Sequence, residues 1–152
     1  MTEFVFLQGD IVEQNAALLV YMNKKDGMVS SYQFKDDPSW GMDNINELNT
    51  GKLMALLSIE YASDEENIDI LDEILEYCER NNVKSLALNG VRDVDQQHLS
   101  EAERNASQNR RCVNTVQHIM SAIYTKGLSL DRVIFCSKTK DYYGKVFKDF
   151  NI

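Results

Sequence analysis

Proline, cysteine and histidine are scarce in this sequence, and each scarcity excludes a class of protein or site. The 152 residues include one proline, so no Pro-rich linker divides the chain, and we expect a single domain over residues 1–152. There is no Cys-x-x-Cys motif and no cluster of cysteine with histidine, which argues against a metal site of the zinc type. The three cysteines, Cys78, Cys112 and Cys136, lie in separate apolar segments and are expected to be core side chains. An odd number of such thiols is typical of the reducing cytoplasm.

Long apolar runs and an excess of basic residues are also missing. No stretch approaches the roughly 20 apolar residues that a membrane-spanning helix needs, and the N-terminus lacks the basic and apolar segments of a secretory signal. The net charge of −8 predicts repulsion of nucleic-acid backbones. A small nucleotide stays compatible with this charge, because backbone N–H groups rather than lysines can hold its phosphates. The chain contains no Walker-type loop and no Gly-x-Gly-x-x-Gly motif.

Apolar runs alternate with amphipathic stretches along the chain. The apolar runs predict strands at 4–7, 16–22, 52–61, 83–88 and 130–136. Apolar residues at three- and four-residue spacing predict helices at 65–81, 100–126 and, more briefly, 141–150. The stretch 23–51 is polar and irregular, with a short helix or strand expected at 29–34. This alternation predicts an α/β fold, a three-layer sandwich around a mixed, largely parallel central sheet.

The spacing of apolar residues also predicts which helix positions face the core. In the first long helix they are Ile68, Leu71, Ile74, Leu75 and Cys78. In the second they are Ala102, Ala106, Val113, Val116, Ile119, Met120 and Ile123. Gly127 is positioned to end the second helix. His118 lies beside this stripe and is expected to be structural or partly exposed, and His98 is expected on a polar surface loop.

Three predicted strands are followed by residues that can bind a ligand. Gly9-Asp10-Ile11 follows the first strand, so a carboxylate and free backbone N–H groups lie at its carboxyl end, where open α/β folds bind ligands. Asn23 ends the second strand, Leu19-Val-Tyr-Met-Asn23. Asp26-Gly27-Met28-Val29 then forms a short glycine-bearing loop, and Asn89-Gly90-Val91-Arg92 follows a later strand.

These motifs, taken in their order with the helices and strands around them, resemble the macrodomain family of ADP-ribose-binding modules. The resemblance covers nearly the whole chain in element order. It implies one macrodomain-like domain whose partner is ADP-ribose or a related nucleotide, and an ADP-ribosylated protein as a further partner, with no cofactor or metal. The chain departs from the family in its glycine loops, and it lacks the family's Asn-Ala-Ala-Asn sequence.

The resemblance assigns roles to individual residues. Asp10 would accept the exocyclic amine of adenine, with the Ile11 N–H close to the ring; the alternative is a turn aspartate that bonds its own backbone. Asn23 would bond a ribose hydroxyl or simply end its strand. The backbone of residues 27–29 (Gly27, Met28 and Val29) would wrap a diphosphate or form a plain turn.

The remaining implied contacts come from the second half of the chain. Gly90 and Val91 would form the opposite wall of the phosphate site, beside Asn89, and Arg92 would offset phosphate charge or lie in a solvated loop. Tyr142 or Tyr143 would pack against adenine, with the other tyrosine in the core.

Three functions remain open from the sequence. The first is binding of ADP-ribose or a related adenine nucleotide. The second is hydrolysis of ADP-ribosylated substrates or ADP-ribose 1″-phosphate, with Asn23, Asn89 or Asp93 orienting the water. The third is a protein-interaction module with a degenerate pocket, which the reduced glycine loops and the bulky Tyr21 and Met28 favour.

Overall fold

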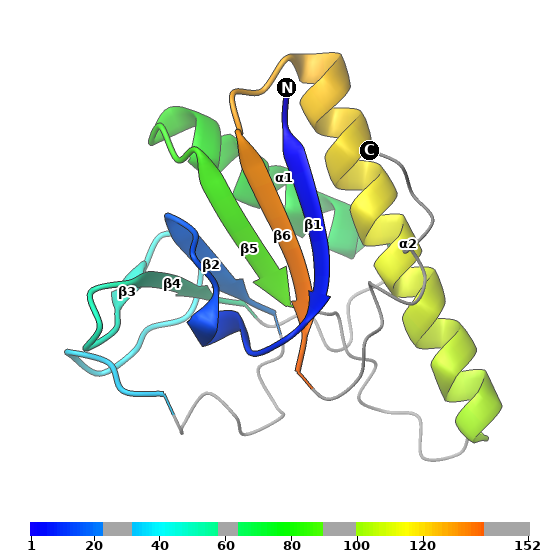
Figure 1. The fold of residues 1–152 in the computed structure, drawn as a ribbon, viewed down its shortest axis with the longest axis horizontal. Helices are drawn as coiled ribbons and strands as arrows, with labels where there is room; N and C mark the ends of the chain where they lie inside the picture. The colour runs from blue at the N-terminus through cyan, green and yellow to red at the C-terminus, as the bar shows by residue number, and fades with distance from the viewer. Residues whose placement is uncertain (23–31, 58–63, 90–99, 139–152) are drawn as a thin grey trace.

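The computed structural model of the protein describes residues 1–22, 32–57, 64–89 and 100–138 (Figure 1). The predicted helix at 141–150 therefore lies outside the described residues, as do the first three residues of the helix or strand predicted at 29–34. Within the described part, the chain is an α/β fold in which helices and strands alternate after a strand-rich first third.

Six strands of the described chain form one mixed, mostly parallel sheet in the order β1-β6-β5-β2-β4-β3. All neighbouring strands are parallel except β3 and β4, which are antiparallel. The strands are β1 (Glu3–Gln8), β2 (Leu18–Tyr21), β3 (Asn46–Glu47), β4 (Leu53–Leu56), β5 (Ser85–Asn89) and β6 (Arg132–Ser137). The predicted α/β class and largely parallel sheet are thus confirmed.

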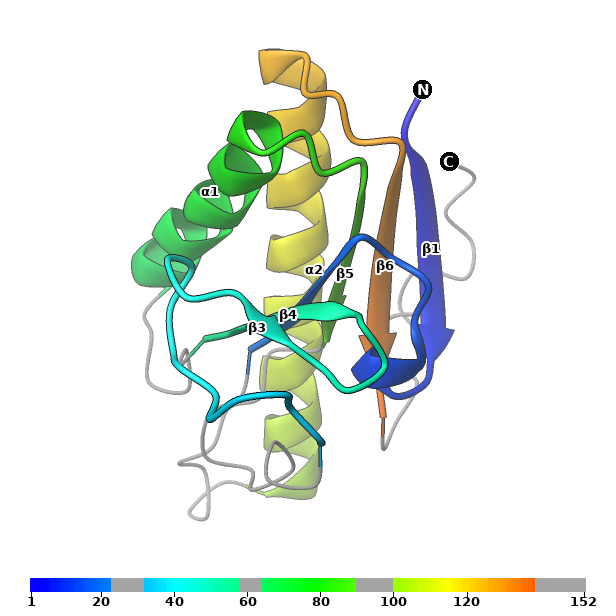
Figure 2. The same cartoon turned by 90° about the vertical axis from the view of Figure 1, so that its left-hand side faces the viewer.

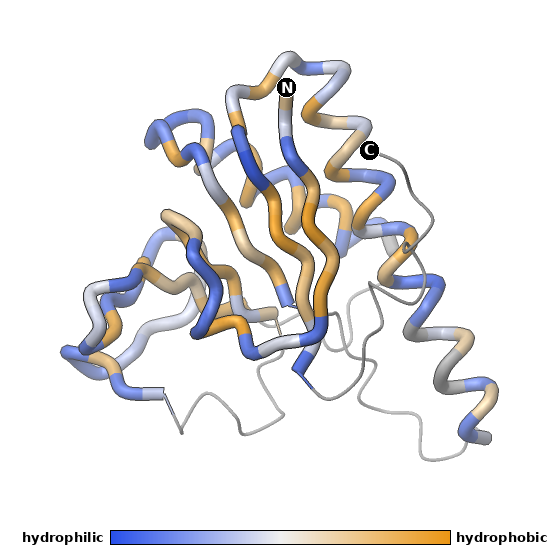
Figure 3. The backbone as a smooth tube through the Cα atoms, in the orientation of Figure 1, coloured by the Kyte–Doolittle hydropathy of each residue, from blue (hydrophilic) through white to orange (hydrophobic). Residues whose placement is uncertain are grey.

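The central strands are buried over most of their length because both of their faces are covered. Every residue of β2 is buried, as are the last four residues of β5 and the last five of β6. Figure 3 shows hydrophobic colour over the middle of the neighbouring strands β6 and β5. Continuous apolar runs of this kind are typical of parallel strands inside an α/β domain.

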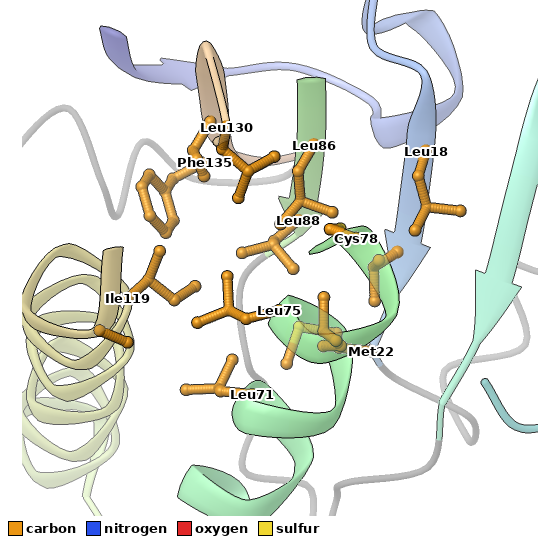
Figure 4. Packing of buried hydrophobic residues seen from close by; sticks show 14 of the residues in the cluster. Leu18, Met22, Leu71, Leu75, Cys78, Leu86, Leu88, Ile119, Leu130 and Phe135 are labelled. Atoms are coloured by element: carbon orange, nitrogen blue, oxygen red, sulfur yellow. The ribbon is translucent and has the colours of Figure 1, made fainter. Parts of the chain in front are cut away.

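Helices α1 (Asp64–Arg80) and α2 (Glu101–Lys126) lie on the same side of the sheet (Figure 2). Their buried side chains form one cluster with alternate residues of the strands, the helix-face cluster, part of which Figure 4 shows. There Leu71 and Leu75 of α1 and Ile119 of α2 pack toward Leu88 of β5 and Phe135 of β6. The apolar side of each helix therefore packs against the sheet.

The ends of α2 are fixed by capping interactions. The Ser100 hydroxyl accepts from the Glu103 N–H at 3.2 Å, and the Glu103 carboxylate accepts from the Ser100 N–H at 3.2 Å, a reciprocal capping box. At the other end, Gly127 adopts the left-handed conformation, with φ 62°, that glycine accepts without a Cβ clash. The predicted role of Gly127 is confirmed.

The opposite face of the sheet is covered by the short 3-10 helix η1 (Ile11–Glu13) and the segment after Tyr32. The buried members of this loop-face cluster are Ile11, Leu19, Tyr21, Leu48, Met54, Leu56, Ala87, Ile134 and Cys136. Lys52 ties η1 to the start of β4 by donating to the carbonyls of Val12 (2.9 Å) and Gln14 (3.2 Å). Neither long helix of the described chain lies on this face, so the predicted three-layer sandwich is not seen among the described residues.

Several predicted details are wrong. Of the strand predicted at 52–61, residues 58–61 lie outside the described residues, and within 52–57 the strand covers Leu53–Leu56. The short β3 was not predicted. Ile68 is 39% exposed while its neighbour Asn67 is buried, so the inward face of α1 begins one position earlier at this end. Ala102 and Ala106 are exposed because the first turns of α2 extend past the sheet (Figure 1).

The cysteines are buried and unpaired by disulfides, as predicted. Burial raises the pKa of Cys78 and of Cys136 to about 12, and the negative charges of Glu79 and Asp10 add to the respective effects. Neither helix of the described chain is long and apolar enough to cross a bilayer.

Candidate functional site

The carboxyl ends of the parallel strands meet at one edge of the sheet (Figure 1). Gly9-Asp10 follows β1, Met22 follows β2, Asn89 ends β5 and Lys138 follows β6. Strands β1 and β6 are joined beyond their ladder by the Gly9 N–H, which donates to the Ser137 carbonyl at 2.9 Å. Ligands of open α/β sheets bind outside this edge, so its polar residues are the candidates for a ligand site.

The Asp10 side chain has three polar partners at this edge. It is the N-cap of η1, and its Oδ1 accepts from the Val12 N–H at 3.2 Å and from the Tyr32 hydroxyl at 2.7 Å. Its Oδ2 lies 3.2 Å from the Lys138 ammonium. The turn aspartate that bonds its own backbone is therefore present, and two side chains from distant segments join it.

These contacts keep Asp10 ionised. Burial alone would raise the pKa of Asp10, but the hydrogen bonds from Tyr32 and Val12 and the charge of Lys138 hold it below its ordinary value. The Asp10 side chain is 14% exposed and that of Lys138 is 48% exposed. The carboxylate is thus a recessed acceptor, and the lysine side chain beside it is the more exposed of the two.

Backbone contacts fix the position of Asp10. The Gln14 side-chain amide donates to the Asp10 carbonyl at 2.9 Å, and the Ile11 side chain is buried in the loop-face cluster. A Cβ on Gly9 would lie 3.1 Å from both Gln14 Nε2 and Leu7 Cδ1, closer than most real contacts. Gly9-Asp10-Ile11 therefore forms a close-packed turn. Gly9 has little room for a Cβ, Asp10 caps η1, and the Ile11 side chain is buried.

Tyr32 links Asp10 to the core. Its ring meets that of Tyr21 edge to face, with centroids 5.9 Å apart and planes at 85°. Tyr21 is 2% exposed and belongs to the loop-face cluster. The large side chain of Tyr21 thus supports the Tyr32 ring, whose hydroxyl reaches the carboxylate.

Asn89 has a backbone partner at the end of the central strands. Its Oδ1 accepts from the Met22 N–H at 2.8 Å, which joins the end of β5 to the residue after β2. The side chain is 9% exposed. This bond gives Asn89 a structural role that is separate from any contact with a ligand.

The structure accounts for some of the predicted site residues and leaves others undescribed. It describes Asp10, Ile11 and Asn89 at the carboxyl edge. His118, expected to be structural, bonds Asp72 of α1 through its Nε2 at 2.6 Å. Outside the described residues lie Asn23, Gly27, Met28, Val29, Gly90, Val91, Arg92, Asp93, His98, Tyr142 and Tyr143.

Sequence reasoning missed Tyr32 and Lys138. Lys138 stands directly after the last strand, so the rule that identified Asp10 could also have identified it. Tyr32 lies in a polar stretch without periodicity, and no signal in the sequence connects it to Asp10.

A separate concave surface lies along the segment before and through β3. It is an acidic hollow of about 410 Å³ lined by Asp36, Asp37, Ser39 and residues 43–47. Lys35 pairs with Glu47 there at 2.8 Å. Across the described ranges, no group of three or more acidic, histidine or cysteine side chains is arranged to hold a metal ion.

Comparison with known proteins adds no relative. No protein-family model matches the chain, and a search of curated proteins finds no significant match.

Proposed function

We propose that the protein binds ADP-ribose or a related adenine nucleotide at the carboxyl edge of its sheet, as a macrodomain-like module. The observation that carries the proposal is the recessed, ionised Asp10 in the turn after β1. A carboxylate with a lowered pKa is an acceptor at neutral pH, and the exocyclic amine of adenine is a donor that suits it.

The capacity of the carboxylate supports this assignment. An ionised carboxylate offers about four acceptor positions. At Asp10, Oδ1 accepts from Tyr32 and Val12, whereas Oδ2 contacts Lys138. Oδ2 can therefore accept one further N–H without breaking a bond that holds the turn.

A catalytic role has less support in the described chain. The Asn89 oxygen accepts from the Met22 N–H, which gives its side chain a structural role and adds nothing to a catalytic one. Asn23 and Asp93 lie outside the described residues. Hydrolysis on this fold remains the second proposal that the sequence motivates, and no described contact adds to it.

Calorimetry with ADP-ribose tests the proposal. We expect saturable binding to the wild-type protein and a loss of about tenfold or more for Asp10→Asn, which keeps the shape but lowers acceptor strength. Asp69→Asn, an exposed change of the same charge on α1, is the matched control and should bind as the wild type does. Absence of binding to the wild type at millimolar ligand would overturn the proposal.

A further inference from the structure

The ion pair between Asp10 and Lys138 presents an acceptor and a donor side by side. Oδ2 and Nζ lie 3.2 Å apart at the carboxyl ends of the neighbouring strands β1 and β6. The ammonium carries three N–H donors, so its contact with Asp10 leaves two for other groups. Nearly half of the Lys138 side chain is exposed, so this side chain is open to solvent at the edge of the sheet.

Adenine carries the complementary pattern. Its exocyclic amine is a donor, and a ring nitrogen next to it is an acceptor, N7 on one edge of the base and N1 on the other. The amine therefore matches Asp10 Oδ2, and the adjacent ring nitrogen matches the Lys138 ammonium. Hypoxanthine replaces the amine with a carbonyl oxygen, which would face the Asp10 carboxylate acceptor to acceptor.

We propose that Lys138 is a specificity-determining residue that donates a hydrogen bond to a ring nitrogen of adenine while Asp10 accepts from the exocyclic amine. This inference rests on the proposed binding of an adenine nucleotide. It assigns the hydrogen bond to a ring nitrogen of the base to Lys138, which was not predicted from the sequence. The Tyr32 and Val12 bonds to Oδ1 hold the carboxylate, and through it the lysine, in position for this contact.

The test combines a protein variant with altered bases, measured by calorimetry. Lys138→Met keeps the length of the side chain and removes its donors. We expect it to weaken ADP-ribose binding about tenfold, the effect of one hydrogen bond to a charged group at a partly exposed site. Lys35→Met removes the same charge from a surface pair away from Asp10 and should leave the affinity unchanged.

Analogues of ADP-ribose that lack one ring nitrogen separate a hydrogen bond from a general effect of charge. One of the 1-deaza and 7-deaza analogues should lose about tenfold with the wild type and nothing further with Lys138→Met, because the two changes remove the same bond. The hypoxanthine analogue should bind the wild type more weakly than ADP-ribose does.

The outcomes distinguish this inference from the function on which it rests. If the wild type does not bind ADP-ribose, both the function and the inference are overturned. If it binds, and Lys138→Met binds equally well or more tightly, the inference alone is overturned. The same holds if both deaza analogues weaken the variant as much as they weaken the wild type, because Lys138 then contacts neither ring nitrogen.

Discussion

The hydroxyl of Tyr32 lies 2.7 Å from Oδ1 of Asp10, across 22 residues of sequence. The two residues come from opposite ends of a stretch that includes β2, and each is held by a different part of the loop face: Asp10 by η1, and Tyr32 by its contact with Tyr21. This bond joins the segment after β2 to the turn after β1, so the candidate site and the packing of the loop face depend on each other.

Removal of the Tyr32 hydroxyl should therefore destabilise the fold. We expect Tyr32→Phe to lower the free energy of unfolding by about 1–2 kcal/mol. The recessed Asp10 carboxylate would lose a hydrogen bond that water replaces poorly there. Urea denaturation measures this change. Tyr124→Phe, on a side chain that is 89% exposed, is the matched control and should have no measurable effect. Equal stability of the two variants would show that the Tyr32–Asp10 bond contributes nothing.

Asp10 should also give the stability a dependence on acid. Its folded pKa is held below the ordinary value of 3.8 by its donors, so its stabilising contribution is present above that pH and is lost as the pH falls through the folded pKa. Unfolding measured between about pH 2 and pH 7 should show a steeper fall below pH 4 for the wild type than for Asp10→Asn. Parallel curves for the two proteins would contradict this assignment.

The cysteine thiols should resist modification in the folded protein. All three side chains are buried, and burial raises the pKa of Cys78 and Cys136 to about 12, so little reactive thiolate forms near neutral pH. A disulfide reagent that reports free thiols should react slowly with the native protein at pH 8 and rapidly with all three cysteines in denaturant. Rapid reaction of a thiol in the native protein would show that one of these side chains is accessible.

The capping box at the start of α2 should contribute to stability independently of the candidate site. Ser100→Ala removes the hydroxyl that accepts from Glu103 and should cost about 1 kcal/mol. Ser121→Ala, at an exposed position within the same helix, should be neutral or slightly stabilising, because alanine favours the helix interior. Thermal unfolding followed by circular dichroism compares the two, and an equal effect would argue that the cap contributes nothing specific.

The regular elements could be predicted where burial imposes a pattern. Strands β5 and β6 are buried over most of their length and therefore read as continuous apolar runs. Helix α1 shows its inward side as a stripe of Leu71, Ile74 and Leu75. In these segments the apolar residues that form the sequence pattern are the same residues that are buried in the core.

Elements defined by tertiary pairing could not be predicted in this way. Strand β3 is the polar pair Asn46–Glu47, which is a strand only because it pairs with β4. Asp10 could be identified because it lies in the turn that ends the first apolar run, but its bond to Tyr32 depends on how a polar segment returns to the sheet. Contacts of this kind come from packing over a distance and leave no periodic signal.

An NMR titration with ADP-ribose tests the central claim most directly. The amides of Gly9 and Val12 are bonded within or beside the Asp10 turn, whereas the amide of Ser129 bonds Glu79 at the opposite end of the helix layer. We expect the Gly9 and Val12 amide signals to shift saturably as ADP-ribose is added, while the Ser129 signal stays in place. In Asp10→Asn the same titration should produce no such shifts. Unmoved Gly9 and Val12 signals at millimolar ADP-ribose would contradict the central claim.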